Sequence, residues 1–102
     1  MLLSSIATAS AQGIVRGKVL DKNTEEPLSY VNVKVSQRGS ETLLKGGVTD
    51  MEGKFVVDGL KNGDYTLTLT FVGYKTLTRQ FTISAKTPTH HYTSLFLSED
   101  AH

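Results

Sequence analysis

The chain has 102 residues, of which 38% are hydrophobic and 21% are charged, and its formal net charge is +1. Its 11 Lys and Arg residues are scattered among 10 Asp and Glu residues, which argues against a nucleic-acid-binding face. The absence of cysteine excludes a disulfide framework, a thiolate zinc site and a cysteine nucleophile. This length suits a single domain with one core.

The first eleven residues have the composition of the end of an export signal. Ala9-Ser10-Ala11 has the form that a signal peptidase cleaves, and cleavage is expected before Gln12. Because no Lys or Arg follows Met1 and the apolar part is short, we interpret residues 1–11 as the remnant of a signal peptide. A mis-started N-terminus is the alternative. No apolar run approaches the ~20 residues of a membrane-spanning helix.

Two strands with one buried face are predicted in the first part of the chain. Residues 13–20 alternate, with Val15, Gly17 and Val19 on one face. After a polar loop that contains Pro27, residues 30–36 alternate in the same way and place their valines inward.

The middle of the chain is less regular. Residues 37–47 are polar and glycine-flanked and are predicted to form a loop, with a short edge strand around Leu43-Leu44 as the alternative. Residues 47–49 and 54–57 are predicted to form a hairpin through the turn Asp50-Met51-Glu52-Gly53, in which Gly53 takes a positive φ.

The last part of the chain predicts three more strands. Residues 65–71 show the cleanest alternation and are predicted to form a central strand. Residues 77–83 follow, with Arg79 as the polar exception on the inner face, and residues 92–97 close the fold. Six or seven short strands with no helical period indicate a sandwich or a barrel.

The order of the turns and strands resembles a known family. The segments are Gly17-Lys18-Val19-Leu20-Asp21, Pro27-Leu28 before Val31-Asn32-Val33-Lys34-Val35, Thr49-Asp50-Met51-Glu52-Gly53-Lys54-Phe55, Leu60-Lys61-Asn62-Gly63-Asp64-Tyr65 and Phe71-Val72-Gly73-Tyr74. Together they resemble the carboxypeptidase regulatory-like domain. The resemblance implies a seven-stranded antiparallel β-sandwich, a transthyretin-like (prealbumin-like) Greek key, over residues 12–98, with residues 99–102 starting a linker.

The resemblance also implies a context. With an export remnant ahead of it, the domain is similar to those at the N-terminus of Bacteroidota TonB-dependent outer-membrane transporters and receptors. We therefore expect a non-catalytic accessory domain on the periplasmic side of the outer membrane, acting in protein contact or as a spacer. Its expected partner is the neighbouring plug and barrel of the same protein, or a periplasmic protein. The alternative is a carbohydrate- or cell-surface-binding module of a secreted enzyme or adhesin.

Residues that could carry chemistry are few, and neither an enzyme nor a cofactor is expected. His90 and His91 are adjacent, so on a strand they point to opposite faces, and His102 is terminal. Four carboxylates could be considered as calcium ligands, namely Asp50, Glu52, Asp58 and Asp64. Their spacing does not match that of a calcium-binding loop. The glycines form no phosphate loop. Hydroxyisourate hydrolases share the transthyretin architecture, but their Tyr-Arg-Gly-Ser ending is absent from residues 97–102.

Aromatic side chains are the remaining candidates for binding. Tyr74 lies at a turn, Tyr92 and Phe96 lie on expected outward faces, and Tyr30 lies at a strand start. Amphipathic rings of this kind contact proteins or sugars at interfaces. The candidate interaction patch is therefore Tyr30, Tyr74, Tyr92 and Phe96, and pairing along an edge strand is a competing mode of contact.

Overall fold

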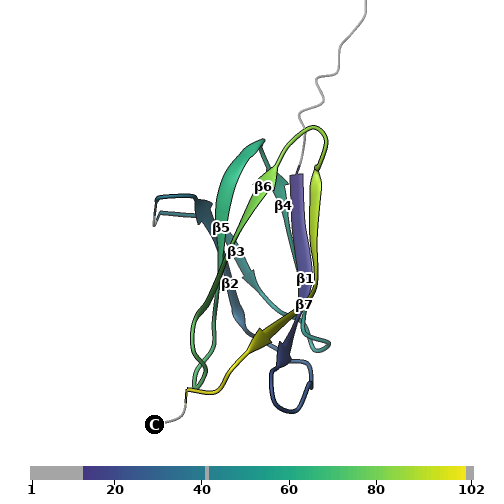
Figure 1. Cartoon of the computed structure of the whole chain (residues 1–102), viewed down its shortest axis with the longest axis vertical. Helices are drawn as coiled ribbons and strands as arrows, with labels where there is room; N and C mark the ends of the chain where they lie inside the picture. The colour runs from purple at the N-terminus through teal and green to yellow at the C-terminus, as the bar shows by residue number, and fades with distance from the viewer. Residues whose placement is uncertain (1–12, 41, 101–102) are drawn as a thin grey trace, which may run out of the picture.

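A computed structural model describes residues 13–40 and 42–100 of the chain as two facing β-sheets (Figure 1). The strands are β1 (Gly13–Asp21), β2 (Asn32–Gln37), β3 (Leu43–Val48), β4 (Lys54–Leu60), β5 (Gly63–Thr70), β6 (Leu77–Ile83) and β7 (Thr89–Leu97). One sheet has the order β4-β1-β7 and the other the order β3-β2-β5-β6. The predicted all-β sandwich of seven strands is confirmed. The proposed signal remnant, residues 1–11, lies outside the described residues.

The core lies between the two sheets and is filled by every second residue of the strands. Its buried hydrophobic members are Val15, Val19, Val31, Val33, Val35, Phe55, Val57, Leu60, Tyr65, Leu67, Leu69, Phe81, Ile83, Leu95 and Leu97. The alternation found in the sequence therefore marks the inner faces correctly. Within the described part of the chain, no helix is long and apolar enough to cross a membrane.

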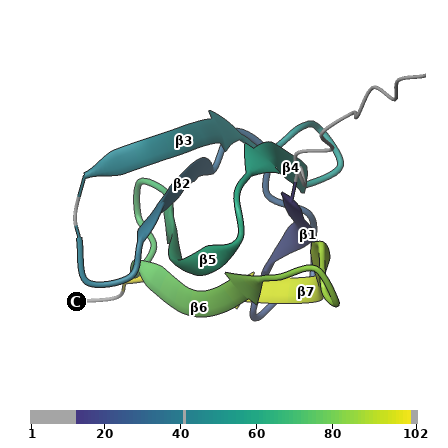
Figure 2. The ribbon, with the colours of Figure 1, turned by 90° about the horizontal axis from the view of Figure 1, so that it is seen from above.

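One pair of strands departs from the antiparallel expectation. β1 and β7 are parallel, with Ile14 opposite Thr89 and Asp21 opposite Leu97, whereas the other four pairs are antiparallel. The reason is that the chain changes sheet after β6, so that β7 runs back on the other layer beside β1 (Figure 2). The first and last strands of the fold are therefore hydrogen-bonded neighbours that point the same way.

The loop predicted over residues 37–47 is wrong in its second half. β3 occupies Leu43–Val48 and pairs with β2, at the edge of the four-stranded sheet. Every residue of β3 is exposed. Because the alternation of apolar and polar residues reports one buried face, a strand with no buried face leaves no such signal.

The predicted hairpin around Asp50 is also wrong, although its turn is correct. The carboxylate oxygen Oδ1 of Asp50 accepts the N–H groups of Glu52 and Lys54, both at 2.8 Å, and Gly53 has a φ of 79°. However, β3 and β4 belong to different sheets, so the turn carries the chain from one layer to the other. β4 pairs with β1 instead.

Strand β6 matches its expected range and lies at the other edge of the four-stranded sheet. Its Arg79 faces solvent, as a charged residue can at an edge.

Candidate functional site

The Phe71-Val72-Gly73-Tyr74 turn fastens the end of the domain. The Tyr74 hydroxyl donates a hydrogen bond of 2.6 Å to Oδ2 of Asp21, the last residue of β1. Oδ1 of Asp21 accepts the N–H groups of Asn23 at 2.7 Å and Thr24 at 2.9 Å. Asp21 is buried, and the Tyr74 ring packs against Phe71 and the core. One carboxylate thus ties β1, its following loop and a turn from the other sheet together.

Backbone bonds attach the segment after β7 to the same turn. Tyr74 and Glu99 form an antiparallel bridge. Lys75 N–H donates to the Ser98 carbonyl, and Asp100 N–H donates to the Gly73 carbonyl, both at 2.9 Å. We call this arrangement of Asp21, residues 71–75 and residues 98–100 the clasp. It holds the chain as it leaves β7.

The hydrogen bond of the clasp changes how its two side chains titrate. Because Tyr74 donates to Asp21, the pKa of the Asp21 carboxyl is lowered from its ordinary value. The same bond, with burial and the nearby negative charge, raises the pKa of Tyr74 to about 12. Both shifts favour the protonation states present at neutral pH, so the clasp is closed under those conditions.

The four aromatic residues of the predicted patch have different surroundings. Tyr30 is 64% exposed and Phe96 is 41% exposed. Tyr74 and Tyr92, expected to face solvent, are instead partly buried and packed against the core. Among the described residues, the ring contacts of Tyr74 and Tyr92 are with Phe71 and His90, and not with one another or with the other two aromatics.

The two adjacent histidines of β7 lie on opposite faces of the strand. His90 is half-buried against the rings of Phe81 and Tyr92, whereas the next residue, His91, is exposed on the opposite face. In the described ranges, no group of three or more His, Asp and Glu side chains is placed to hold a metal ion. Asp50 is engaged by its own turn, and Asp64 by Thr82 and Arg38.

The strand register collects positive charge where the sequence shows only scattered residues. On the outer face of the β4-β1-β7 sheet, Lys18 lies opposite Lys54, and Arg16 lies opposite His91. A shallow hollow is lined by these four side chains. The grouping depends on which residues of three strands are paired, so the order of residues in the chain does not reveal it.

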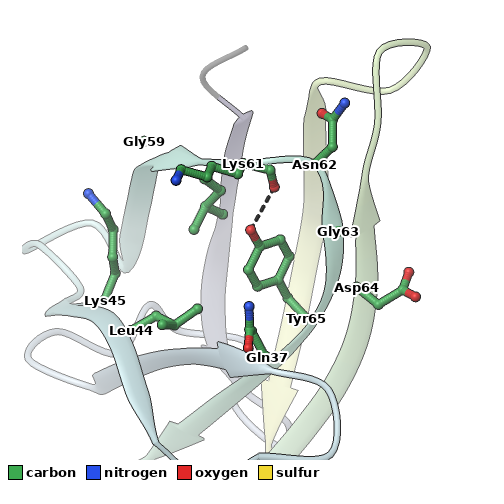
Figure 3. A pocket seen from close by; sticks show the side chains of 10 residues that line it. Gln37, Leu44, Lys45, Gly59, Lys61, Asn62, Gly63, Asp64 and Tyr65 are labelled. Atoms are coloured by element: carbon green, nitrogen blue, oxygen red, sulfur yellow. Dashed lines mark hydrogen bonds between the residues drawn. The ribbon is translucent and has the colours of Figure 1, made fainter. Parts of the chain in front are cut away.

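A second hollow lies at the end of the sandwich where β1 begins (Figure 3). It has a volume of about 410 Å³. Leu44 and Tyr65 point into it from opposite walls, and the Tyr65 hydroxyl donates to the Lys61 carbonyl at 2.6 Å. Lys45 and Lys61 also line it. None of these residues was expected to be part of a site. Leu44 and Lys45 lie on a strand that has no sequence signal, and the pattern around Lys61 and Tyr65 predicts only a turn and a strand.

The family comparison agrees with the order of these structural residues. The CarboxypepD_reg-like domain family matches residues 15–102. The chain belongs to this family. In this CarboxypepD_reg-like domain, the segments that carry the resemblance form the inner faces of the strands, the Asp50 turn and the clasp. The chain matches no curated protein.

Solved structures with the same architecture come from pilins and from an enzyme. The domain superposes on the major pilin subunit of Bacillus cereus with a TM-score of 0.72 and 16% identity, covering 87% of this chain and 30% of the pilin. The streptococcal ancillary pilin gives a TM-score of 0.67 and 22% identity, covering 89% of this chain and 30% of the pilin. The 5-hydroxyisourate hydrolase of Klebsiella pneumoniae gives a TM-score of 0.61 and 20% identity, with 85% of each chain covered.

These likenesses establish the fold and nothing beyond it. The CarboxypepD_reg-like domain spans less than half the length of the pilin chains that it matches. The hydrolase is similar over most of its own length and adds a transthyretin-like neighbour to the comparison.

Proposed function

We propose that this domain is a non-catalytic periplasmic accessory domain at the N-terminus of a TonB-dependent outer-membrane transporter or receptor. In this role it acts as a spacer and contacts the neighbouring plug and barrel or a periplasmic protein. The family membership supports the module, and the resemblance of the motif set supports the context.

One observation carries the spacer role. The described chain starts with β1 at one end of the sandwich and leaves after β7 at the other end (Figure 1). These two strands are parallel and directly hydrogen-bonded, and the clasp fastens the chain after β7. A domain built in this way holds the segments on its two sides apart by the length of its strands, in a fixed direction.

The parent reading frame tests the context directly. We expect a sequence with the plug and barrel of a TonB-dependent protein to follow the domain. A frame that encodes an enzyme or an adhesin after residue 102 would overturn the proposal and favour the carbohydrate-binding alternative.

A deletion tests the role within the parent protein. Removal of residues 13–98 is expected to leave insertion of the barrel into the outer membrane intact and to reduce uptake of its substrate. As a control, a deletion of the same residues with a replacement domain of equal end-to-end length separates the spacer role from specific contact. Unchanged uptake after simple deletion would contradict both roles.

A further inference from the structure

Strand β3 is an edge strand, and none of its side chains is buried in the core. It pairs with β2 on one side and with no strand on its other side among the described residues. All of its residues are exposed, yet three of them are large and apolar, namely Leu43, Leu44 and Val48. An apolar strand with a free edge is the element to which an extended peptide adds most readily.

The register shows which backbone groups of β3 are free. The Thr49 N–H donates to the Val31 carbonyl. In an antiparallel ladder, hydrogen-bonded pairs alternate with pairs that are not bonded, so every second residue of β3, counted from Thr49, bonds to β2. Gly47, opposite Val33, therefore bonds to β2. Gly46 and Val48 lie at the intervening positions, so their N–H and C=O groups point away from the sheet.

A bulge beside these groups directs a side chain into the hollow at the end of the sandwich. Ser36 pairs with Leu43 and Val35 with Lys45, so Leu44 is the extra residue. Leu44 and Tyr65 line the hollow (Figure 3). Leu60 also lines it and adds to its apolar wall. A strand added to β3 passes the mouth of this hollow.

The charge around the mouth indicates the chemistry of the partner. Lys45 and Lys61 line the hollow. Its carboxylate, Asp64, already accepts a hydrogen bond from Thr82 at 2.7 Å and lies 4.0 Å from the Arg38 guanidinium. The two lysines therefore leave a positive rim beside an apolar pocket.

Gly47 has no evident role inside the domain. An added Cβ there would meet nothing within 4 Å, and its φ is not in the left-handed region. A side chain at this position would project from the face of β3 into open space, so the glycine leaves that face of the strand free.

From these observations we propose that β3 binds an extended acidic peptide of a partner protein. The peptide adds to the sheet through Gly46 and Val48, places an apolar side chain against the exposed Leu44 at the hollow, and directs carboxylates toward Lys45 and Lys61. This inference deepens the protein-contact part of the proposed function and rests on it.

Two other occupants fit less well. A second copy paired antiparallel through the middle of β3 would bring the two Lys45 side chains to facing or adjacent positions, and like charges there oppose pairing. A sugar would need an accessible ring face, but Tyr65 is 4% exposed and stacks on Phe81 at 5.4 Å.

The experiment uses the full 102-residue chain, labelled with ¹⁵N, and two synthetic peptides. The acidic probe is acetyl-Ser-Thr-Glu-Val-Leu-Val-Glu-Thr-Ser-amide, in which both Glu residues share a strand face with the central Leu. The basic probe has Lys in place of both Glu residues. We expect the acidic probe to shift amide signals of residues 43–48 and 60–65. Its dissociation constant should be at least about tenfold lower than that of the basic probe.

The variant Val48→Pro removes an outward N–H and leaves the bonds of Gly47 and Thr49 to β2 in place. We expect it to weaken binding of the acidic probe by about tenfold or more. Thr78→Pro is the matched control at the opposite edge of the same sheet. Thr78 is opposite Thr68, whose backbone faces β2, so its N–H also points outward; this variant should bind as the unchanged chain does.

The double variant Lys45→Glu with Lys61→Glu should reverse the preference between the two probes, and it keeps the test valid if Val48→Pro fails to fold. Equal binding of both probes, binding of neither, or shifts confined to β6 and β7 would overturn the proposal. So would a dimer formed through β3, or a malto-oligosaccharide that shifts the same residues while the peptide does not. A parent frame without a transporter would overturn the proposed function and leave these peptide results standing.

Discussion

The small side chain of Thr49 is buried and makes two hydrogen bonds to backbone groups of another segment. It is 1% exposed. Its hydroxyl donates to the Leu28 carbonyl at 2.7 Å and accepts from the Val31 N–H at 2.9 Å. The hydroxyl thus ties the residue after β3 to two points of the segment that leads into β2. Both backbone partners lie far from Thr49 in the sequence, so local patterns cannot identify its role.

Thr49→Val keeps the shape of the side chain and removes the hydroxyl, which leaves a buried donor and a buried acceptor without a partner. We expect the free energy of unfolding to fall by about 3 kcal/mol. Thr49→Ser, which keeps the hydroxyl and loses a methyl group, should cost about 1 kcal/mol. Urea denaturation of both variants checks this, and equal losses would show that the hydroxyl is not what matters.

The clasp predicts a pH dependence at Tyr74. Its pKa is raised from 10.0 to about 12, so its contribution to stability is complete below pH 10.0 and is lost as the pH rises toward 12. Asp21 has a lowered pKa, so its contribution is complete above 3.8 and is lost as the pH falls further. We expect Tyr74→Phe to lower the thermal midpoint by about 5 °C at neutral pH.

Thermal midpoints of the Tyr74→Phe variant and the unchanged chain, measured across pH, check both limbs. The difference between them should shrink on the alkaline side. On the acid side it should also shrink as Asp21 becomes protonated. The bonds from the N–H groups of Asn23 and Thr24 to Asp21 are common to both proteins and cancel in the difference. A difference that stays constant into strong alkali would refute the clasp as the cause.

Two glycines with positive φ should respond differently to alanine. Gly73 has a φ of 86° and open space around an added Cβ, so only backbone strain opposes the change, which should cost about 1 kcal/mol. At Gly53 an added Cβ would also lie 2.6 Å from the Val19 carbonyl oxygen. We therefore expect Gly53→Ala to cost about 3 kcal/mol or more. Chemical denaturation measures both, and the reverse order would contradict this account.

Among the elements, the strands with one buried face are those that the sequence predicts well. β5 and β6 show why: Leu67, Leu69, Phe81 and Ile83 recur at every second position and are all buried. β3 escapes prediction because nothing in it is buried. The Asp50 turn was predictable from local chemistry, but the sheet to which each flanking strand belongs depends on long-range pairing.

In the candidate sites too, local chemistry is visible in the sequence, whereas contacts between distant segments are not. Tyr74 stands out in the sequence as an aromatic turn residue, but its partner Asp21 is 53 positions away, so its role as a clasp could not be read locally. The hollow beside β3 requires the bulge at Leu44, and the basic outer face requires the pairing of β1 with both of its neighbours.

The pairing of β1 with β4 places like charges opposite each other, which predicts a stabilising substitution. Lys18 is opposite Lys54, and Arg16 is two positions away on the same face. Lys18→Glu should raise the free energy of unfolding by about 0.5 kcal/mol at low salt, and the gain should nearly disappear at about 1 M salt. Lys86→Glu, in the turn after β6, is the control with the same change in charge; an equal gain there would point to net charge instead of the pair.

For the whole molecule, the parallel pairing of β1 with β7 decides how the domain responds to tension. Force applied through the two ends of the described chain pulls β1 and β7 in opposite directions along their common ladder. All the hydrogen bonds between them are then loaded together in shear, because the evenly spaced bonds of a parallel pair run the length of both strands. Resistance to tension of this kind is compatible with the spacer role proposed above.

Single-molecule pulling can compare this geometry with one that peels the same ladder. Because the chain has no cysteine, attachment at a single introduced Lys86→Cys is specific. Residue 86 precedes β7 and lies at the end where β1 begins, since Ile14 N–H donates to the Pro88 carbonyl at 2.9 Å. Force between the N-terminus and residue 86 therefore opens the bonds one after another, and we expect a lower unfolding force than between the two termini.

Tyr74→Phe should lower the unfolding force in the end-to-end geometry, in which the clasp is loaded first, and leave the peeling force nearly unchanged. Equal forces in the two geometries would mean that the β1 and β7 ladder does not bear the load.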